Sequence, residues 1–496
     1  MPDPLLAELA EATWIGGCPR ESRGWLPVED PATAEVLAEV ALVDAALVLE
    51  AVEAAVAAAP AWAATAPQRR ADLLARAEGM LRSRVEEGAS LITAEAGKPV
   101  AEARAEIEYA ADYLRWYAAD AVRLAGSVTP SPSGEADLLV ERRPVGPCYL
   151  VTPWNLPLAM AARKVAPALA AGCTTIVKPS ELTPLTMLWF ARILAEAGAP
   201  EGVVSVLVSD EPAMVTAHVL GDPRVRKVSF TGSTRVGRAL LQSASAHVVR
   251  ASMELGGNAP FLVLPGADTE LAVAAALTAK GRNAGQTCVA PNRFLVHESL
   301  HDEVVDGLVE RYGSLVQGPG RESTTQVGPL ITAAAASRVD GLVEDAVVRG
   351  ATRATAARPP RSGHFVAPTV LVNVPSDAPV WEEEVFGPVI SVQAYRDVAD
   401  AVAEANRTDA GLAAYVIGPD RGCATEVARC LEVGMVAVND GRISEVAAPF
   451  GGVRSSGLGR EGGLHGIDEY LEERYVRIPR GGPLLTSLAS GAGELG

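Results

Sequence analysis

A cysteine that follows small and polar residues is the first candidate for chemistry. Cys288 closes the string Asn283-Ala-Gly-Gln-Thr-Cys288, whose glycine and small residues predict an exposed turn between a helix and a strand. A thiolate at such a turn can attack a carbonyl carbon and form a covalent intermediate. Because most free cysteines are buried and inert, a structural thiol is the alternative.

A glutamate placed before two glycines is the second candidate. In Met253-Glu-Leu-Gly-Gly-Asn258 the apolar residues predict a strand end, and the two glycines predict a tight turn that presents Glu254 to a cleft. A carboxyl group in apolar surroundings has a raised pKa and can act as a general base. A helix N-cap or a surface acid is the alternative.

An asparagine between two prolines is the third candidate. In Thr152-Pro-Trp-Asn-Leu-Pro157 the prolines fix the backbone around Asn155 and remove two N–H donors. The side-chain amide is then available to donate to a developing oxyanion. An Asx-turn is the alternative interpretation.

Two glycine motifs could hold a phosphate. Phe230-Thr-Gly-Ser-Thr-Arg-Val-Gly237 reads as a strand, a turn and a helix start, and the free N–H groups of a helix N-terminus suit a pyrophosphate. A plain strand-to-helix turn is the alternative. Gly457-Leu-Gly-Arg-Glu-Gly462 matches the dinucleotide fingerprint as a string, but no strand precedes it and no βαβ unit surrounds it.

The segment Val177-Lys-Pro-Ser-Glu181 follows a predicted strand. A lysine and a glutamate at the carboxyl end of a parallel strand are placed to hold a ribose, although either could be a surface charge. We find no P-loop, no HExxH and no Gly-x-Ser-x-Gly motif, and the six histidines lack metal-ligand spacing. We therefore expect no metal.

The elements around these motifs predict an α/β fold with a largely parallel sheet, because short apolar runs alternate with helical patterns. Strands are expected at 137–143, 148–152, 174–178, 203–208, 227–230 and 259–263. Helices are expected at 45–59 (ended by Pro60), 67–87 (before Gly88), 100–124, 159–171, 185–197, 212–220, 233–246 and 270–283. A second α/β series follows from about residue 293 to 439.

Composition excludes several classes of function. The chain has 496 residues, 49% of them hydrophobic and 21% charged, which is typical of a globular protein with roughly three domains or subdomains. Its formal net charge of −18 disfavours binding to nucleic acid or to a membrane surface. No segment looks apolar for long enough to span a membrane. The cysteines are scattered, and the first twenty residues have acidic residues before the first basic one, unlike a secretory signal peptide. Both features favour the cytoplasm.

Taken together and in order, these strings resemble the aldehyde dehydrogenase superfamily up to about Ile478. The seven motifs are Pro153-Trp-Asn155, Lys178-Pro-Ser-Glu181, Phe230-Thr-Gly-Ser233, Glu254-Leu-Gly-Gly257, Gly285-Gln-Thr-Cys288, Glu384-Val-Phe-Gly-Pro388 and Pro449-Phe-Gly-Gly452. The resemblance implies NAD(P)-dependent oxidation of an aldehyde to a carboxylic acid through a cysteine thiohemiacetal and thioester. It also implies two Rossmann-type α/β domains and a β-hairpin oligomerisation arm.

The resemblance places domain boundaries as well. An NAD-binding domain would span 1–125 and 147–255, and a catalytic domain would span 256–455. The arm would comprise 126–146 and 470–480, with the first segment pairing with the second segment of a partner chain. A projecting hairpin with open edges favours a homodimer or homotetramer. Residues 481–496 would form a loose tail.

The site residues follow from the same likeness. Catalysis would use Cys288 as nucleophile, Glu254 as base and Asn155 as oxyanion donor. The residues expected to bind the cofactor are Thr152, Trp154, Lys178, Glu181, Gly232, Ser233, Glu384 and Phe386. A carboxylate at Glu181 accepts hydrogen bonds from a free ribose hydroxyl and repels a 2′-phosphate, so NAD is favoured over NADP.

Longer runs look most like the succinate-semialdehyde dehydrogenase branch, among them Ala159-Met-Ala-Ala-Arg-Lys164. That branch would hold the substrate carboxylate with Arg163, Arg282 and Ser444. The chain departs from it at three positions, which are Gly281, Ala290 and Arg442. Ala290 removes a second cysteine and its redox switch, whereas the other two positions leave room for a different aldehyde.

Three alternatives stay open. The enzyme could act on a bulkier or aromatic aldehyde. It could be a cofactor-free cysteine hydrolase or acyltransferase, which would need His297 or His301 beside Cys288. It could also be a protein that keeps the fold without activity, although every proposed catalytic side chain is present.

Overall fold

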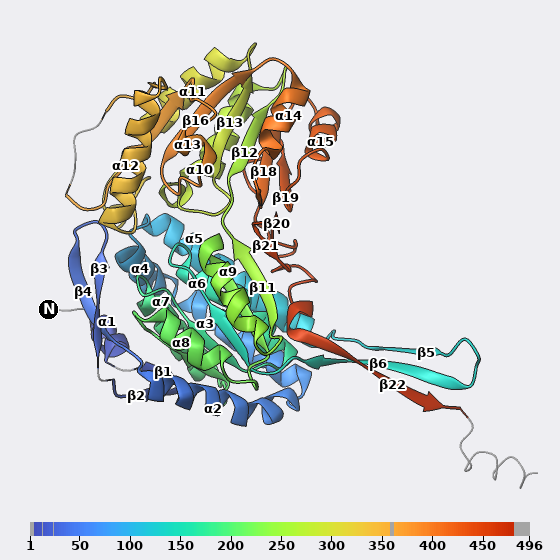
Figure 1. Ribbon diagram of the computed structural model, residues 1–496. Coiled ribbons are helices and arrows are strands. Elements are labelled where there is room, and N and C mark those ends of the chain that lie inside the picture. Colours follow the sequence, from blue (N-terminus) through green and yellow to red (C-terminus); the bar gives the residue numbers. More distant parts are fainter. Residues whose placement is uncertain (1–3, 12, 23, 358–361, 481–496) are drawn as a thin grey trace, which may run out of the picture.

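The computed structural model describes residues 4–11, 13–22, 24–357 and 362–480. They form two lobes, each built on its own sheet, and a long arm of strands that projects from the lower lobe (Figure 1). The predicted tail, 481–496, lies outside the described residues.

The lower lobe is built on an eight-stranded sheet. In spatial order its strands are β2 (Cys18–Arg20), β1 (Thr13–Ile15), β9 (Val204–Val206), β8 (Thr175–Lys178), β7 (Cys148–Val151), β10 (Lys227–Gly232), β11 (Arg250–Leu255) and β21 (Gly457–Leu458). The five strands from β9 to β11 are parallel. The chain runs from β7 outward to β9 and returns to β10, so the order reverses between β7 and β10, where α/β sheets bind ligands.

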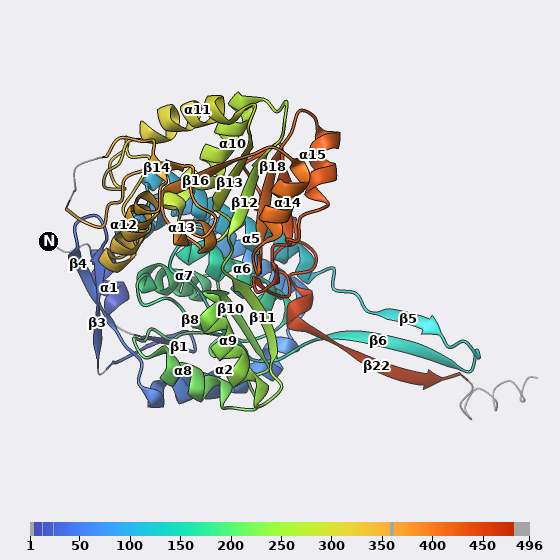
Figure 2. The same ribbon diagram turned by 45° about the horizontal axis from the view of Figure 1, so that its top comes forward.

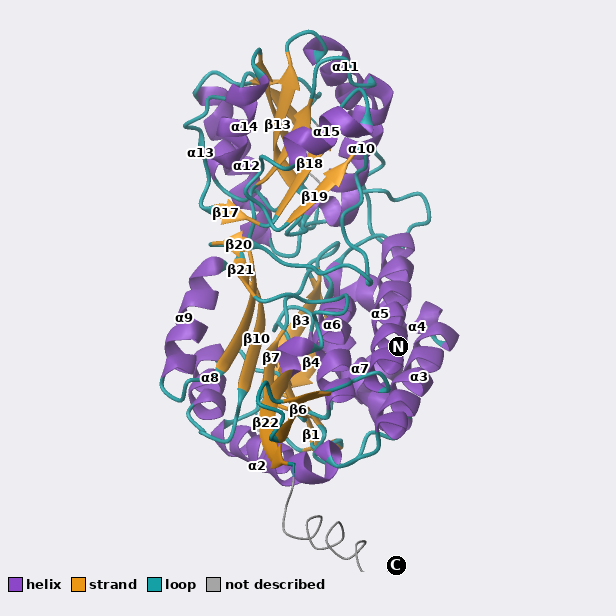
Figure 3. Ribbon diagram, turned by 90° about the vertical axis from the view of Figure 1, so that its right-hand side faces the viewer, coloured by secondary structure: helices purple, strands orange, loops and turns teal. Residues whose placement is uncertain are grey.

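Helices cover both faces of this sheet (Figure 3). One face carries α3 (Pro67–Ser83), α4 (Val85–Ala96), α5 (Val100–Ala121), α6 (Pro157–Ala171) and α7 (Pro184–Glu196). The other face carries α2 (Ala45–Ala63), α8 (Pro212–Leu220) and α9 (Thr234–Ser245). A short helix and a hairpin complete the lobe, namely α1 (Pro4–Ala10), β3 (Trp25–Asp30) and β4 (Glu35–Ala41).

Two expected helix ends were wrong. Helix α2 continues through Pro60, because the N–H of Ala64 still bonds the Pro60 carbonyl and Trp62 is buried in the next turn. The helix expected at 67–87 is two helices, and Gly88 lies inside the second one. A Cβ at Gly88 would lie 2.5 Å from the ring of Trp189, so this glycine allows close packing rather than ending a helix.

Helix α2 also corrects the expectation that no segment is apolar for long enough to span a membrane. Length and composition alone would allow it to do so, since its apolar window has a mean hydropathy of 1.5. In the structure, one side of the helix packs into the core of the lower lobe through Val48, Ala51, Val52 and Ala55.

The upper lobe is built on a seven-stranded sheet that is parallel except at β14. In spatial order its strands are β14 (Thr352–Arg353), β15 (Thr369–Val372), β16 (Val389–Tyr395), β13 (Pro291–His297), β12 (Ala259–Val263), β18 (Ala413–Ile417) and β19 (Met435–Val438). Its helices are α10 (Thr269–Gly281), η1 (Arg282–Gly285), α11 (His301–Gly313), α12 (Ala333–Val348), α13 (Pro379–Glu382), α14 (Val398–Asn406) and α15 (Arg421–Ala428). A two-stranded pair, β17 (Ala410–Gly411) and β20 (Val453–Arg454), lies near the junction of the lobes.

The arm is a three-stranded sheet in the order β22 (Leu471–Pro479), β6 (Ala136–Pro144) and β5 (Ser127–Pro130) (Figure 2). Strand β22 pairs with β6 of its own chain, which corrects the expected pairing with a partner. The physical reason is the short helix η2 (Asp468–Tyr470), because its buried Tyr470 accepts a hydrogen bond from the N–H of Val145 and so holds β22 beside β6.

Candidate active site

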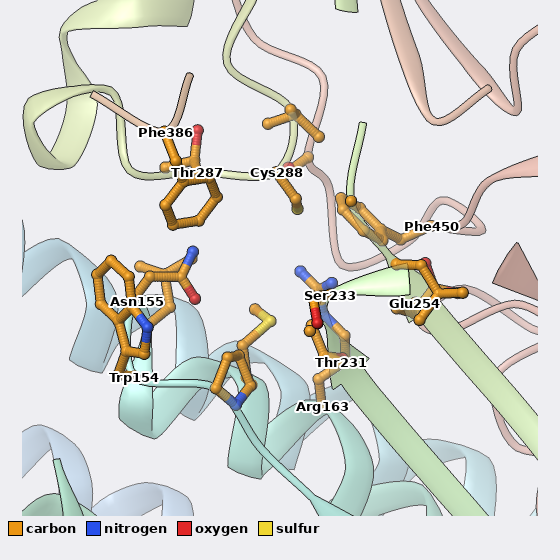
Figure 4. A pocket seen from close by; sticks show the side chains of 18 of the residues that line it. Trp154, Asn155, Arg163, Thr231, Ser233, Glu254, Thr287, Cys288, Phe386 and Phe450 are labelled. Carbon is orange, nitrogen blue, oxygen red and sulfur yellow. The ribbon is translucent and has the colours of Figure 1, made fainter. Parts of the chain in front are cut away.

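A cavity of about 240 Å³ lies where the lobes meet (Figure 4). Among its lining residues are eleven of those expected from the sequence, which are Trp154, Asn155, Arg163, Gly232, Ser233, Glu254, Arg282, Cys288, Glu384, Phe386 and Ser444. In Figure 4, Cys288 and Phe386 lie above Asn155 and Trp154, and Glu254 lies across the pocket from Asn155. Thr152, Lys178 and Glu181 do not line this cavity.

Cys288 lies in the loop that joins η1 to β13, and it is half-buried at the cavity wall. Three successive residues before it, Asn283, Ala284 and Gly285, have φ of +48°, +52° and +76°. A Cβ at Gly285 would lie 2.2 Å from the Gly387 carbonyl oxygen, so only glycine fits there. Non-glycine residues in this conformation store strain, which marks a loop whose shape is held by its surroundings.

Burial raises the pKa of the Cys288 thiol to about 12. The Arg163 guanidinium opposes this shift, whereas the carboxyl groups of Glu384 and Glu254 add to it. The thiol is therefore protonated at neutral pH in this state. Its ionisation needs additional positive charge or a base.

Asn155 follows β7, and hydrogen bonds hold both its side-chain amide and its backbone carbonyl. Its side-chain amide donates a hydrogen bond of 2.9 Å to the carbonyl of Gln286, two residues before Cys288. Its own carbonyl accepts from Lys98 Nζ at 2.7 Å and from Asn283 Nδ2 at 3.0 Å. One bond fixes one N–H of the amide, so the second N–H is available to a ligand in the cavity.

Glu254 lies in β11 and its side chain is buried, which rules out the N-cap and surface-acid alternatives. Among the described residues, neither of its carboxyl oxygens has a hydrogen-bond partner. Burial, together with the nearby carboxylate of Glu461, raises its pKa well above the ordinary range. A buried carboxyl group without a partner beside a cavity is suited to accept a proton from a bound molecule.

Glu461 was missed from the sequence because it falls in the rejected Gly457–Gly462 string. It is buried and forms an ion pair with Lys164, and its other oxygen lies 3.7 Å from Arg163 Nη1. The charges around Glu254 are thus the Glu461 carboxylate and three cations, which are Lys164, Arg163 and Arg460. No pattern in the sequence signals this group, because the ion pair joins residues that are 297 positions apart.

Arg163, on α6, is held by aromatic rings that the sequence did not predict as site residues. Its guanidinium carbon lies 4.1 Å from the ring centroid of Phe450 and 5.4 Å from that of Tyr113. Its Nη2 donates to the Tyr109 hydroxyl at 3.1 Å. Arg282 is exposed at the start of η1 and lines the same cavity. The cavity therefore has a cationic end.

The opposite end is aromatic. Trp154 and Phe386 meet edge to face, with ring centroids 5.5 Å apart and an interplanar angle of 84°. Glu384 is close to them in the cavity wall and accepts a hydrogen bond of 3.2 Å from the Gly257 N–H. Burial raises the pKa of Glu384 to about 7. Planar rings with one carboxyl group nearby suit a flat heterocycle that carries a sugar.

Gly232 and Ser233 form the turn between β10 and α9, at the point where the strand order reverses. Ser233 caps α9 by accepting a hydrogen bond from the Val236 N–H, and the first turn of a helix leaves other N–H groups free. Such a helix start fits a pyrophosphate, as expected for a dinucleotide.

Thr152, Lys178 and Glu181 lie at the ends of β7 and β8, on the same sheet edge as this turn. The Thr152 N–H bonds the Lys178 carbonyl at 3.1 Å, and Lys178 Nζ lies 3.7 Å from a carboxyl oxygen of Glu181. A dinucleotide extends over several strand ends, so one bound at this sheet edge could reach from these residues to the cavity.

The positions that depart from the branch pattern lie outside the cavity lining. A Cβ at Gly281 would meet no atom within 4 Å, so a larger side chain would fit there. Arg442 is exposed, and its N–H bonds the Asp440 carboxylate. Neither residue lines the cavity, so the structure does not link either one directly to its shape.

The residues required for a cysteine hydrolase are not beside Cys288. The rings of His297 and His301 bond Ser299 and Asp302, and neither histidine lines the cavity. Within the described ranges, no group of three or more His, Cys, Asp or Glu side chains is arranged to hold a metal ion.

Comparisons with known proteins agree with this geometry. The model of the aldehyde dehydrogenase family matches residues 18–476. The chain is 49% identical over 429 residues to a succinate-semialdehyde dehydrogenase of Paenarthrobacter nicotinovorans, covering 86% of this chain and 95% of that one. It is 41% identical to the NADP(+) succinate-semialdehyde dehydrogenase of Escherichia coli, covering 91% and 94%.

A solved structure is equally similar. The succinate-semialdehyde dehydrogenase of Burkholderia pseudomallei superposes with a TM-score of 0.94 at 42% sequence identity, over 97% of this chain and all of that one. Fold, motifs and sequence therefore agree, and this chain belongs to the aldehyde dehydrogenase family.

Proposed function

We propose that the protein oxidises a semialdehyde, an aldehyde with a carboxylate at its far end, to the dicarboxylic acid with NAD as hydride acceptor. The observation that carries this proposal is one cavity that holds Cys288, Asn155 and Glu254 together with two arginines. The relatives compared above are succinate-semialdehyde dehydrogenases, which supports the same activity here. Succinate semialdehyde is the substrate that we favour.

The first step is attack of the Cys288 thiolate on the aldehyde carbon, which forms a thiohemiacetal. The free N–H of the Asn155 amide and the backbone N–H of Cys288 stabilise the oxyanion. Positive charge near the sulfur lowers the raised pKa of the thiol, and Arg163 supplies part of that charge.

When bound, NAD would supply a hydride acceptor, and loss of hydride from the thiohemiacetal carbon would leave a thioester on Cys288. Trp154 and Phe386 provide the apolar walls for its flat ring, and Glu384 provides an acceptor for ribose hydroxyl groups. Glu254 then takes a proton from water, which attacks the thioester and releases the acid. The raised pKa of Glu254 makes it a stronger base once it is ionised.

Arg163 and Arg282 determine which aldehyde fits, because a carboxylate is the natural partner of a guanidinium. Ser444 lines the same cavity and can donate its hydroxyl to that carboxylate. An aldehyde without a carboxylate would leave Arg163 buried beside an apolar ligand, which costs binding free energy.

NAD is preferred over NADP in this proposal, although the Escherichia coli relative is named for NADP(+). Glu181 lies 3.7 Å from Lys178 and already partners the cation that could otherwise attract a 2′-phosphate. Its carboxylate would also repel that phosphate directly. We assign cofactor binding to residues 1–125 and 147–255 and catalysis to 256–455.

We also propose a homodimer or homotetramer, because the arm leaves strand edges uncovered. Val128 in β5 and Tyr475 in β22 are large side chains that are more than half exposed. Light scattering at micromolar concentration tests this proposal. A monomer alone would contradict it.

The substrate proposal is tested by NADH formation from succinate semialdehyde and from butanal, which has the same carbon chain without the carboxylate. Arg282→Leu should raise KM for the semialdehyde about 10- to 100-fold and change KM for butanal little, because a charged hydrogen bond contributes about 1.5–3 kcal/mol. Arg396→Leu, a matched substitution at an exposed ion pair with Glu298 away from the cavity, is the control. Equal loss on both aldehydes would contradict the carboxylate site.

A further inference from the structure

Lys98 is a buried lysine that contacts the backbone of Asn155. It lies in the loop between α4 and α5, and its side chain is 1% exposed. Its ammonium group donates to the Asn155 carbonyl at 2.7 Å and to a carboxyl oxygen of Glu106 at 2.5 Å. Burying an ammonium group costs free energy unless an opposite charge and hydrogen bonds replace its lost hydration. Here the Glu106 carboxylate and the Asn155 carbonyl do so.

Glu106 connects the same lysine to helix α6. Its second carboxyl oxygen accepts hydrogen bonds from the N–H groups of Leu158 and Ala159, in the first turn of α6. Lys98 and Glu106 together therefore hold Asn155 and the helix start that follows it. Arg163 lies on the same helix, one turn further along.

Both lobes enclose Lys98. A Cβ at Gly320 would lie 2.2 Å from the Lys98 carbonyl oxygen, and a Cβ at Gly328 would lie 2.3 Å from the Gly97 carbonyl oxygen. These glycines let the backbone of the upper lobe close around the loop. This close approach of the two backbones restrains the loop, so packing as well as charge helps to position its lysine.

The same segment of the upper lobe holds the cysteine loop. Gln286 accepts a hydrogen bond from the Ile331 N–H, and its carbonyl accepts from the Asn155 amide. Asn283 adds a second donor to the Asn155 carbonyl. The backbone and the side chain of Asn155 are thus held by different parts of the molecule, which together define where its remaining N–H points.

Glu95 provides an internal comparison. Its two carboxyl oxygens accept from the N–H groups of Leu185 and Thr186, in the first turn of α7, so it caps that helix as Glu106 caps α6. Glu95 is also fully buried, but it has no ion pair within the described residues, and burial raises its pKa to about 8. Helix α7 does not line the cavity. Capping a helix with a buried carboxyl group therefore does not require a lysine, and Glu106 differs from Glu95 in pairing with a lysine that also donates to the Asn155 carbonyl.

We propose that Lys98, paired with Glu106, is a positioning residue that aims the Asn155 amide at the oxyanion of the first chemical step. This inference rests on the proposed function, in which Asn155 donates to that oxyanion. Lys98 does not line the cavity that holds Cys288, so we assign its effect to its hydrogen bond with the Asn155 carbonyl. A donor displaced by about 1 Å loses much of its effect on a transition state, so the consequence for rate is large.

The test separates two reactions of the same sulfur. Single-turnover NADH formation needs an oxyanion donor, whereas alkylation of Cys288 by iodoacetamide does not. The variant is the double substitution Lys98→Met with Glu106→Gln, which removes both charges and keeps a carbonyl oxygen to cap α6. Glu95→Gln is the matched control for a buried helix cap, and Asn155→Ala is the reference for complete loss of the donor.

The double variant should form NADH about 10- to 100-fold more slowly in the first turnover and react with iodoacetamide within about 2-fold of the parent, since only the oxyanion is affected. Asn155→Ala should lose about 10²- to 10³-fold. Glu95→Gln should lower the melting temperature and leave both rates unchanged. If the double variant does not fold, Lys98→Arg retains the charge but moves the donor, and the same separation of rates is expected.

Unchanged NADH formation in the double variant would overturn the inference. An equal fall in both reactions would also overturn it, because the whole cysteine loop would then be disturbed. No effect of Asn155→Ala would instead contradict the oxyanion role in the proposed function, so the two failures are distinguishable.

Discussion

The two sides of the cavity are held in different ways. On the side of the chemistry, Asn155 and the loop that ends at Cys288 are buried and cross-linked by hydrogen bonds from both lobes. On the cofactor side, the Ser233 hydroxyl caps α9 through a long hydrogen bond of 3.4 Å, and the Glu181 side chain is 45% exposed.

This difference matches what each side must do. Covalent chemistry needs groups whose positions are fixed before the substrate arrives. A dissociable cofactor needs polar groups that can exchange water for ligand in every cycle. The structure therefore holds Asn155 and the cysteine loop with hydrogen bonds from both lobes, and it leaves Ser233 and much of the Glu181 side chain exposed to solvent.

The largest effect should come from the chemistry side. Glu254→Gln removes the base that activates water but leaves the thiol and the oxyanion donor in place. We expect steady-state turnover to fall about 10²- to 10⁴-fold while a first burst of NADH remains, as measured by stopped-flow absorbance. Loss of the burst as well would show that Glu254 acts before the thioester forms.

A substitution on the cofactor side should have a smaller effect. It should change the preference between NAD and NADP rather than the rate of turnover. Glu181→Ser removes the carboxylate that repels a 2′-phosphate and frees Lys178 to attract it. The ratio of kcat/KM for NAD to that for NADP should fall about 10-fold or more, which corresponds to one charged hydrogen bond. An unchanged ratio would refute the role assigned to Glu181.

The raised pKa of Glu384 predicts that cofactor affinity depends moderately on pH. Burial raises its pKa to about 7, so its carboxylate form, the better acceptor for ribose hydroxyl groups, increases as pH rises from 6 to 8. The Kd for NADH, measured by fluorescence, should fall several-fold over that range, and Glu384→Gln should flatten the profile. Lys280, whose pKa burial lowers to about 7, loses charge over the same range, so Lys280→Met is the control. A profile that only Lys280→Met flattens would contradict the assignment.

The smallest effect concerns stability. Ser233→Ala removes the capping bond of α9, and we expect a loss of less than about 1 kcal/mol in thermal unfolding. Asp44→Ala removes a shorter capping hydrogen bond, which the Leu47 N–H of α2 donates at 2.9 Å, and it should lower the free energy of unfolding by at least as much. A larger loss at Ser233 would mean that the cofactor side is as tightly held as the chemistry side.

Local patterns in the sequence predicted the alternation of strands and helices. Cys288, Glu254 and Asn155 were found because each stands beside glycine or proline at the end of an element, and the structure brings all three to one cavity. Their roles, and a cytoplasmic location, stay predictions. The residues that the sequence did not reveal are Lys98, Glu106 and Glu461. Their contacts with Asn155, with Leu158 and with Lys164 span 52 to 297 positions.

The errors have a common physical cause. Pro60 and Gly88 were taken as helix ends because local rules treat proline and glycine as breaks, whereas Trp62 and Trp189 supply tertiary packing that overrides those rules. The pairing of β22 with β6 depends on where η2 turns the chain, and strand propensity alone carries no information about which chain supplies the neighbour.

The central claim is that the Cys288 sulfur bonds to the carbon of the substrate. Glu254→Gln protein should be mixed with NAD and succinate semialdehyde, quenched in acid within the first turnover, and analysed by peptide mass spectrometry. We expect one succinyl group per chain on the peptide that contains Cys288, and none in the absence of NAD or in the additional variant Cys288→Ala. NADH formation without an acyl group on that peptide, or an acyl group on another residue, would show that Cys288 is not the nucleophile.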